Sequence, residues 1–251
     1  FVFYPDWGKP SIKYIRIENF EITNIYDPAK PFPQGGGIYL GGRLDTVTIE
    51  NIEIVNNFLH DLNAKPPAEK ESFVNGIWGA NRYLKNIFVK GNTLFHTQGT
   101  AINVMGDTWL VEDNDVSHTL DTNTDSGATV NGDSDALRIL GTGHVIRGNY
   151  LHDCLEAPEQ IGTPHIDGIQ IFSEDPGQFA SQILIENNYI YNVGQGFIGS
   201  DTTELKGGIN AVHDITLRNN VIRKTSGVGL NIGVDYFTLV NNAIIDTTDY
   251  G

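Results

Sequence analysis

Cysteine, long apolar runs and basic residues are all scarce in this chain. The one cysteine, Cys154, excludes an internal disulfide framework, and a single cysteine is usually a small buried hydrophobic residue. No apolar run approaches the roughly 18 residues of a membrane-spanning helix, and the first residues do not have the pattern expected of a signal peptide. Sixteen Lys and Arg face 31 Asp and Glu, a net charge of −15. Because phosphate backbones require a basic stripe, this charge argues against a nucleic-acid partner and favours a neutral or weakly charged ligand.

Glycine and short alternating segments are plentiful, with 28 glycines in 251 residues. A small residue, a branched aliphatic residue, an outward position and a further small or aliphatic residue recur seven times. The seven segments are Gly37-Ile38-Tyr39-Leu40, Gly76-Ile77-Trp78-Gly79, Ala101-Ile102-Asn103-Val104, Ala136-Leu137-Arg138-Ile139, Gly168-Ile169-Gln170-Ile171, Gly208-Ile209-Asn210-Ala211 and Gly229-Leu230-Asn231-Ile232. Alternation of period two predicts strands with one buried face, and helical spacing is not visible.

A second repeated element, built around asparagine, alternates with the first. Its segments begin with Gly, Asp or Asn followed by Asn92, Asn114, Asn149, Asn188, Asn220 and Asn242. Repeats of roughly 20 to 35 residues with internal strand patterns are typical of solenoids. The sequence therefore predicts an all-β, right-handed parallel β-helix of about seven to eight rungs, forming a single domain over residues 1–251. Neither end has a clear polar cap, so we expect a piece of a longer secreted protein or a subunit covered by a neighbour.

With its rungs aligned, the chain resembles the right-handed parallel β-helix proteins of the pectate-lyase-like superfamily. The asparagine column is similar to the inward ladder whose stacked amides satisfy backbone groups at one turn of those helices. The resemblance implies a fold shared by polysaccharide lyases, hydrolases, epimerases, phage tailspikes and adhesins, and it does not choose among them.

Catalytic residues are most expected where two neighbouring rungs carry long insertions, at residues 119–134 and 155–166. Each insertion returns to its strand through an acid, Asp135 or Asp167, and the alignment stacks these two acids one rung apart. His165 precedes Asp167, and Arg138 follows Asp135. A carboxylate pair of this kind supplies the acid and base that glycosidic cleavage needs. The segment His165-Ile166-Asp167-Gly168 also looks like the Asn-Thr-Asp-Gly motif of polygalacturonase-type hydrolases, which implies the general-acid role for Asp167. That family's paired Asp-Asp and its Gly-His-Gly are missing, so its substrate is not carried over.

Outward positions of the same sheet predict a glycan-binding groove. One row aligns aromatic rings with amides, which suit sugar faces and sugar hydroxyls. Its members are Tyr39, Trp78, Asn103, Arg138, Gln170, Asn210 and Asn231, with Met105, Leu140 and Phe172 two residues further on. Glu156, in the second insertion, is also predicted to bind substrate. The alternative is a solvated sheet face without a ligand.

Other interpretations of the same residues stay open. Asp135 and Asp167 could each cap a turn by accepting backbone N–H groups, and Arg138 could simply form an ion pair. Polysaccharide cleavage by a lyase would use Arg138 as the base and bind Ca²⁺ on the Asp-rich residues 121–133; otherwise no cofactor is expected. A non-catalytic fibre, tailspike shaft or adhesin, assembling as a homo-oligomer or end to end, is the third alternative. Each would be extracellular or at the cell surface.

Four histidines, His60, His96, His118 and His152, are predicted to fall in one column on consecutive rungs. A metal-binding strip is conceivable at the strand spacing of about 4.8 Å. The sequence favours instead a surface row in which the imidazoles pair with Asp61 and Asp153, and no metal site is predicted.

Overall fold

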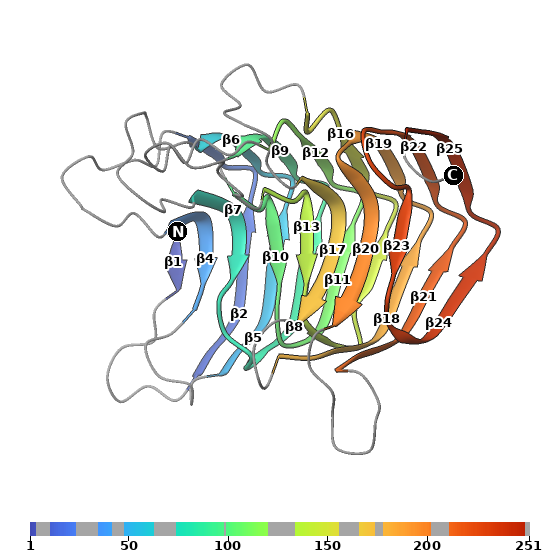
Figure 1. Cartoon of the computed structure of the whole chain (residues 1–251). Helices are drawn as coiled ribbons and strands as arrows, with labels where there is room; N and C mark the ends of the chain where they lie inside the picture. The colour runs from blue at the N-terminus through green and yellow to red at the C-terminus, as the bar shows by residue number, and fades with distance from the viewer. Residues whose placement is uncertain are drawn as a thin grey trace, which may run out of the picture.

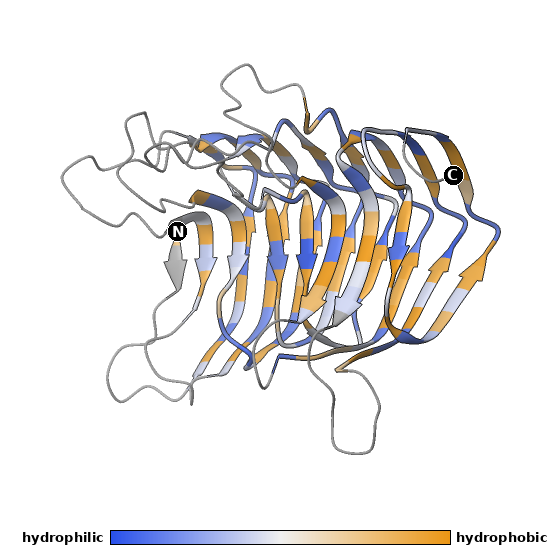
Figure 2. Ribbon diagram, viewed as in Figure 1, coloured by the Kyte–Doolittle hydropathy of each residue, from blue (hydrophilic) through white to orange (hydrophobic). Residues whose placement is uncertain are grey.

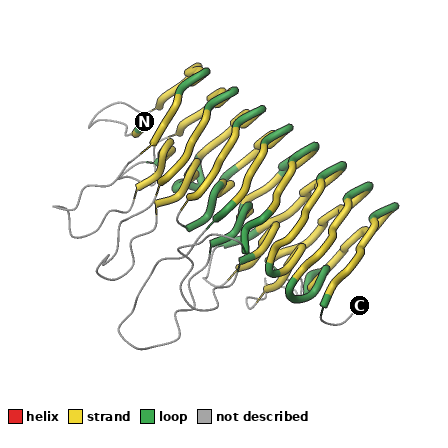
Figure 3. Tube along the Cα trace, turned by 90° about the horizontal axis from the view of Figure 1, so that it is seen from above, coloured by secondary structure: helices red, strands yellow, loops and turns green. Residues whose placement is uncertain are grey.

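The protein is a parallel β-solenoid in the computed structural model, which describes residues 1–3, 11–23, 35–41, 48–62, 74–97, 99–119, 134–155, 166–173, 178–201 and 211–248. All strand pairs of these residues are parallel. The chain visits three sheets in turn, and each return adds a strand beside the previous one (Figures 1 and 3). The all-β solenoid predicted from the repeats is therefore confirmed.

The three sheets contain eight, nine and eight strands. Sheet 1 consists of β1 (Val2–Phe3), β4 (Gly35–Leu40), β7 (Val74–Gly79), β10 (Ile102–Val104), β13 (Leu137–Ile139), β17 (Asp167–Ser173), β20 (Gln195–Asp201) and β23 (Leu230–Ile232). Sheet 2 consists of β2 (Ser11–Glu18), β5 (Thr48–Val55), β8 (Leu84–Lys90), β11 (Asp107–Glu112), β14 (Gly141–Thr142), β15 (Val145–Arg147), β18 (Ala180–Glu186), β21 (Val212–Arg218) and β24 (Asp235–Val240). Sheet 3 consists of β3 (Glu21–Thr23), β6 (Phe58–Leu62), β9 (Thr93–Thr97), β12 (Asp115–Ser117), β16 (Tyr150–His152), β19 (Tyr189–Val193), β22 (Val221–Thr225) and β25 (Ala243–Thr247).

Six of the seven predicted repeat segments overlap strands of sheet 1, and the seventh is wrong. The strand between β17 and β23 is β20, so the sheet position expected for residues 208–211 belongs to Gly196-Phe197-Ile198-Gly199. This segment escapes the pattern because its outward residue, Ile198, is an aliphatic residue and breaks the alternation that marks the other segments.

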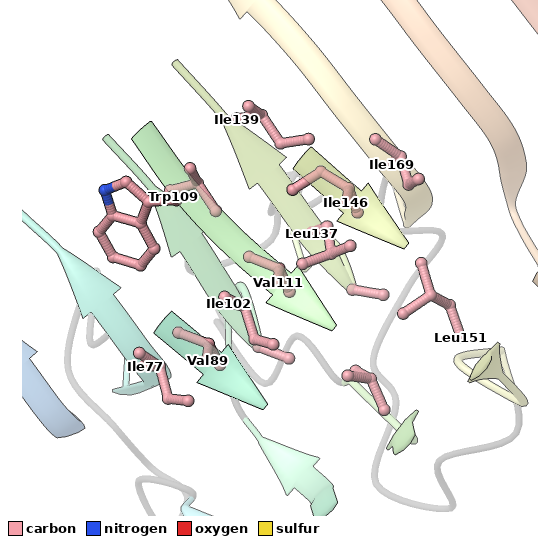
Figure 4. Packing of buried hydrophobic residues seen from close by; sticks show 14 of the residues in the cluster. Ile77, Val89, Ile102, Trp109, Val111, Leu137, Ile139, Ile146, Leu151 and Ile169 are labelled. Atoms are coloured by element: carbon pink, nitrogen blue, oxygen red, sulfur yellow. The ribbon is translucent and has the colours of Figure 1, made fainter. Parts of the chain in front are cut away.

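Inward side chains stack into apolar columns that run the length of the solenoid. Ile77, Ile102, Leu137 and Ile169 form one such column in sheet 1, and none has exposed surface (Figure 4). Apolar and polar residues alternate along many of the strands in the hydropathy colouring (Figure 2). Burial of apolar area at about 25 cal/mol per Å² makes this continuous core the main source of stability.

The predicted asparagine ladder lies at the corner between sheets 2 and 3. Each ladder amide donates to a main-chain carbonyl of the neighbouring coil, and each except the last also donates to the Oδ1 of the next asparagine at 2.9–3.0 Å. The ladder has one member more than predicted: it runs through Asn57, Asn92, Asn114, Asn149, Asn188, Asn220 and Asn242. Asn57 follows Asn56, the same Asn-Asn signal that marks Asn188 and Asn220.

Left-handed backbone conformations also stack from coil to coil, in three columns with φ between 50° and 72°. One column immediately precedes the ladder and contains only Asn, Asp and Gly, which tolerate this conformation. A second column interrupts sheet 2 and consists of Tyr14, Asn51, Asn86, Thr108, Gly143, Gln182, Asp214 and Tyr236. The third follows the outward residues of sheet 3 and consists of Asp61, His96, His118, Asp153, Asn192, Lys224 and Asp246.

Candidate functional site

The candidate site occupies the outer face of sheet 1. Pairing between strands joins Tyr39 to Trp78, Trp78 to Asn103, Asn103 to Arg138 and Arg138 to Gln170, so this part of the predicted row is confirmed. The next partners of Gln170 are Ile198 and Asn231. Ile198 thus takes the place that we predicted for Asn210, which lies outside the described residues.

Asp135 and Asp167 stand three positions before Arg138 and Gln170, yet on the same outer face. In the first of the two coils, Ala136 and Leu137 separate Asp135 from Arg138. Both of these consecutive residues point inward and are fully buried. The equivalent glycine of the next coil, Gly168, confirms this geometry, because a Cβ there would meet the core side chain of Ile190 at 2.6 Å. This inward pair returns the acids to the face of the row.

The two acids lie on adjacent coils and are joined through the backbone. Asp135 Oδ1 accepts a hydrogen bond from the backbone N–H of Asp167 at 3.1 Å. Neither acid has exposed surface. This bond joins two coils, and it is not the contact within one turn that we considered as an alternative for Asp135.

Arg138 and Gln170 connect the two acids into one side-chain network. Arg138 Nε donates to Gln170 Oε1 at 2.6 Å and lies 3.9 Å from Asp135 Oδ2. The Gln170 amide donates to Asp167 Oδ2 at 3.2 Å. Buried carboxylates need donors or a cation nearby, and these two residues supply both. Of the four side chains, Arg138 alone is substantially exposed, at 29%.

Asn231 is exposed, but several other members of the row are less exposed than we predicted. Tyr39 and Trp78 are half-buried and contact edge to face, with ring centroids 5.1 Å apart. Asn103 is buried, and its amide donates to the carbonyl of Gly79 at 2.6 Å. Phe172 is half-buried and pairs with Ser200 of β20. The row is therefore a partly covered strip rather than an open groove of aligned side chains.

Three predicted site residues cannot be placed with the others. His165, Glu156 and Asn210 lie outside the described residues, as do most of the two insertions, at residues 120–133 and 156–165. Their roles remain predictions.

The predicted histidine column is wrong by one residue. His60 pairs with Phe95, and His152 pairs with Ser117, so His96 and His118 fall in the next, left-handed column instead. The error arises because His60 and His152 follow their ladder asparagines by three residues, whereas His96 and His118 follow theirs by four. Strand pairing alone resolves this difference.

The predicted pairing of these imidazoles with Asp61 and Asp153 is confirmed for three of the four histidines, His60, His96 and His152, whereas the buried Nδ1 of His118 has no hydrogen-bond partner among the described residues. Nδ1 of His60 and Nδ1 of His96 each lie 2.8 Å from a different oxygen of Asp61. Nδ1 of His152 lies 2.8 Å from Asp153 Oδ2. Although burial lowers the pKa of His60, its hydrogen bonds to Asp61 and Glu21 raise it above the ordinary value overall. Hydrogen bonds from His96 and His60 lower the pKa of Asp61.

A further histidine that the sequence did not single out lies within the core. His144 follows Trp109 in an inward column of sheet 2, and it has no exposed surface. Its Nδ1 accepts from the backbone N–H of Trp109 at 3.0 Å, and Nε2 donates to the carbonyl of Leu140 at 3.1 Å. Burial lowers the pKa of His144 to about 4, which keeps the imidazole neutral. No sequence pattern marks this residue, because it replaces an aliphatic side chain in a single coil.

Cys154 is buried, as predicted, and burial raises the pKa of its thiol to about 11. Among the described residues, no group of three or more His, Cys, Asp or Glu side chains has a geometry that could hold a metal ion. The Asp-rich residues 121–133, for which Ca²⁺ was considered, are not among them. Nor does the described part of the chain contain a helix of the length and apolar character needed to cross a membrane.

Comparison with the models of known protein families and with curated proteins finds no match for this chain.

Proposed function

We propose that this protein cleaves a glycan, as a glycoside hydrolase whose site is the network of Asp135, Arg138, Gln170 and Asp167. The observation that carries the proposal is the joining of two acids on adjacent coils with a cation and an amide on one outer face. Glycoside hydrolases use a pair of carboxyl groups, one to protonate the leaving oxygen and one to act on the anomeric carbon or on water. The resemblance to the pectate-lyase-like superfamily, based on the asparagine corners, agrees with this class of activity.

In the proposed mechanism Asp167 is the general acid, the role that its resemblance to the Asp of the Asn-Thr-Asp-Gly motif implies, and the Gln170 amide orients one of its carboxyl oxygens. Asp135 is the second carboxylate, oriented by the N–H of Asp167 and by the nearby Arg138. Arg138 contacts the glycan first, since it is the exposed member of the network. The buried acids become accessible only through a local opening of this face. Tyr39 and Trp78 extend the contact surface along the row. We expect such a protein outside the cell or at its surface, where such polysaccharides occur.

A lyase is the second candidate, and the exposure of Arg138 favours it. In that reaction the basic group removes the C5 proton of a uronate, and no water is consumed. The two reactions leave different products, since a hydrolase creates a reducing end and a saturated sugar, whereas a lyase also creates an unsaturated one that absorbs ultraviolet light.

The test is a screen of the purified protein against neutral and uronate-containing polysaccharides, with reducing ends and ultraviolet absorbance read together. Reducing ends without absorbance are expected, and Asp167→Asn and Asp135→Asn should each abolish them. The asparagine amides preserve size and one acceptor oxygen, so the urea midpoint of unfolding should change little. Asp115→Asn, an exposed acid of sheet 3, is the matched control and should retain full activity. Products that absorb ultraviolet light would indicate a lyase instead. If the folded protein released neither kind of product from any polysaccharide, both the hydrolase and the lyase proposals would be overturned.

A further inference from the structure

The outer face of sheet 2 has a depression that is separate from the network on sheet 1. It has a volume of about 440 Å³ and spans the first three strands of the sheet, β2, β5 and β8. Its lining residues are Tyr14, Ile15, Arg16, Asn51, Glu53 and Phe88. The volume lies within the range of about 300–1,000 Å³ that is typical of small-ligand sites.

Two exposed aromatic rings line this depression. Tyr14 is 80% exposed, the highest value among the large hydrophobic residues described, and Phe88 is 41% exposed. Phe88 continues the column of Arg16 and Glu53, two coils along from Arg16. Rings that gain this little from packing are available to stack on a ligand.

Tyr14 also has a backbone conformation that does not favour tyrosine. Its φ is 59°, in a column where Asn, Asp, Gly, Gln and Thr occupy the inner coils. A left-handed conformation costs an ordinary residue roughly 1–2 kcal/mol. Tyr236, in the last coil of the same column, shares this conformation and is 67% exposed. Because Tyr236 is not among the residues that line the depression, it is a natural internal control.

Polar groups between the rings are already held in place. Arg16 donates two hydrogen bonds to Glu18, at 2.7 and 2.8 Å, and a third to Glu53 Oε2. The amide of Asn86 donates to Asn51 Oδ1 at 3.3 Å. Within the described residues, Glu53 Oε1 and Asn51 Nδ2 have no hydrogen-bond partner, which leaves one acceptor and one donor beside the rings. Arg16 and Glu53 compensate each other's charge, so the lining carries no net charge for an ionic ligand.

We propose that this depression is a second glycan-binding site, specific for a neutral saccharide and independent of the chemistry on sheet 1. Tyr14 and Phe88 stack on the faces of a sugar ring, whose apolar C–H groups suit aromatic rings. Asn51 Nδ2 donates to one hydroxyl group, and Glu53 Oε1 accepts from another. The ion pairs of Arg16 fix Glu53 before binding, which reduces the ordering cost on association.

The experiment is affinity electrophoresis through native gels that contain xyloglucan, galactomannan, mixed-linkage β-glucan, starch or polygalacturonate. We expect retardation by at least one neutral polysaccharide. Tyr14→Asn and Phe88→Thr should each raise the apparent Kd about threefold to tenfold. Tyr236→Asn should leave the Kd unchanged, although it relieves the same backbone strain. All variants are also compared in a Trp78→Ala background, so that binding along sheet 1 does not contribute.

The Asp167→Asn variant should still be retarded in these gels, because the second site does not include that acid. This result would test the second binding site independently of the proposed hydrolase activity. No retardation by any neutral polysaccharide would overturn the proposal, as would retardation by polygalacturonate alone. Equal binding by the wild type and Tyr14→Asn in the Trp78→Ala background would also overturn it, and so would an equal loss in Tyr236→Asn.

Discussion

Removing one amide from the middle of the asparagine ladder should destabilise the protein by several kcal/mol. Asn149 is 1% exposed. Its Oδ1 accepts from both the backbone N–H and the side-chain amide of Asn114, at 3.0 and 2.9 Å. Its Nδ2 donates to Asn188 Oδ1 at 2.9 Å and to the carbonyl of Val111 at 3.0 Å. The substitution Asn149→Ala removes these bonds together and offers no replacement.

The magnitude follows from the groups that lose a partner. A buried polar group left without a hydrogen bond costs about 1–3 kcal/mol. The Asn114 N–H and the Val111 carbonyl are two such groups, and the Asn114 amide keeps its bond to the carbonyl of Val89. We therefore expect Asn149→Ala to lower the free energy of unfolding by about 2–6 kcal/mol. Asn149→Asp should cost more, because it turns a carboxylate oxygen toward two acceptors.

Asn242, the last rung of the ladder described, is the matched control. It makes equivalent contacts with Asn220 and with the carbonyl of Leu217, but it is half-buried, so water can replace the lost bonds. Asn242→Ala should cost roughly 1 kcal/mol. Urea unfolding, with midpoint and slope compared between variants, measures both values. A loss below 1 kcal/mol for Asn149→Ala, or equal losses for both variants, would refute the view that the ladder stabilises by satisfying buried groups.

Three other perturbations test the core. The pKa of His144 is about 4 in the folded protein against an ordinary 6.5, so the unfolded chain gains a proton first as the pH falls. The free energy of unfolding of the wild type should therefore drop by about 3 kcal/mol between pH 6.5 and 4, relative to that of His144→Leu. The same pH dependence of urea unfolding in both proteins would contradict this. Cys154, whose thiol pKa is raised to about 11, should react with a disulfide reagent at pH 8 only after unfolding in urea, and rapid labelling of the folded protein would contradict its burial. Gly79→Ala should cost about 1–3 kcal/mol in urea, because its Cβ would meet Trp109 Cζ2 at 2.9 Å, whereas Gly36→Ala, with contacts of 3.3–3.4 Å, should cost less.

Stacking makes the fold predictable from the sequence. The ladder asparagines repeat once per coil because each one hydrogen-bonds to the next, so a residue type in one coil constrains the same position in its neighbour. The inward aliphatic residues of sheet 1 are constrained in the same way by packing. Repetition of a contact appears in the sequence as repetition of residues, and this is why the sequence predicts most strands of sheet 1.

Single-residue shifts are where the sequence becomes ambiguous. His60 and His96 differ by one position relative to the ladder, and only the pairing of His60 with Phe95 separates their columns. In sheet 3 a left-handed residue comes directly after the outward residue of each of seven coils, so a shift of one residue exchanges an extended strand position for a left-handed one. A different cause led us to assign residues 208–211 to the sheet position of β20: Ile198 presents an apolar side chain on the outer face, so its segment lacks the alternation of the other repeats.

The alternation of apolar and polar residues along a strand predicts which face of the sheet a side chain lies on. It does not predict whether that face is exposed to solvent. Arg138 and Gln170 are paired on the outer face as predicted, yet Gln170 is 3% exposed while Arg138 is 29% exposed. Asp135 and Asp167 are outward and fully buried.

For the proposed hydrolase, the difference in exposure between Arg138 and the two acids sets the order in which the glycan contacts them. Arg138 is the contact available to an arriving glycan, and its bond to Gln170 Oε1 links that contact to the amide holding Asp167. A glycan hydroxyl or carboxylate that draws Arg138 away from Gln170 would therefore release the amide and expose the acid. The substitution Gln170→Glu would hold Arg138 more tightly and repel Asp167, so it should lower kcat by a larger factor than it raises KM. If Gln170 were purely structural, the substitution would change the stability of the protein and leave kcat and KM unchanged.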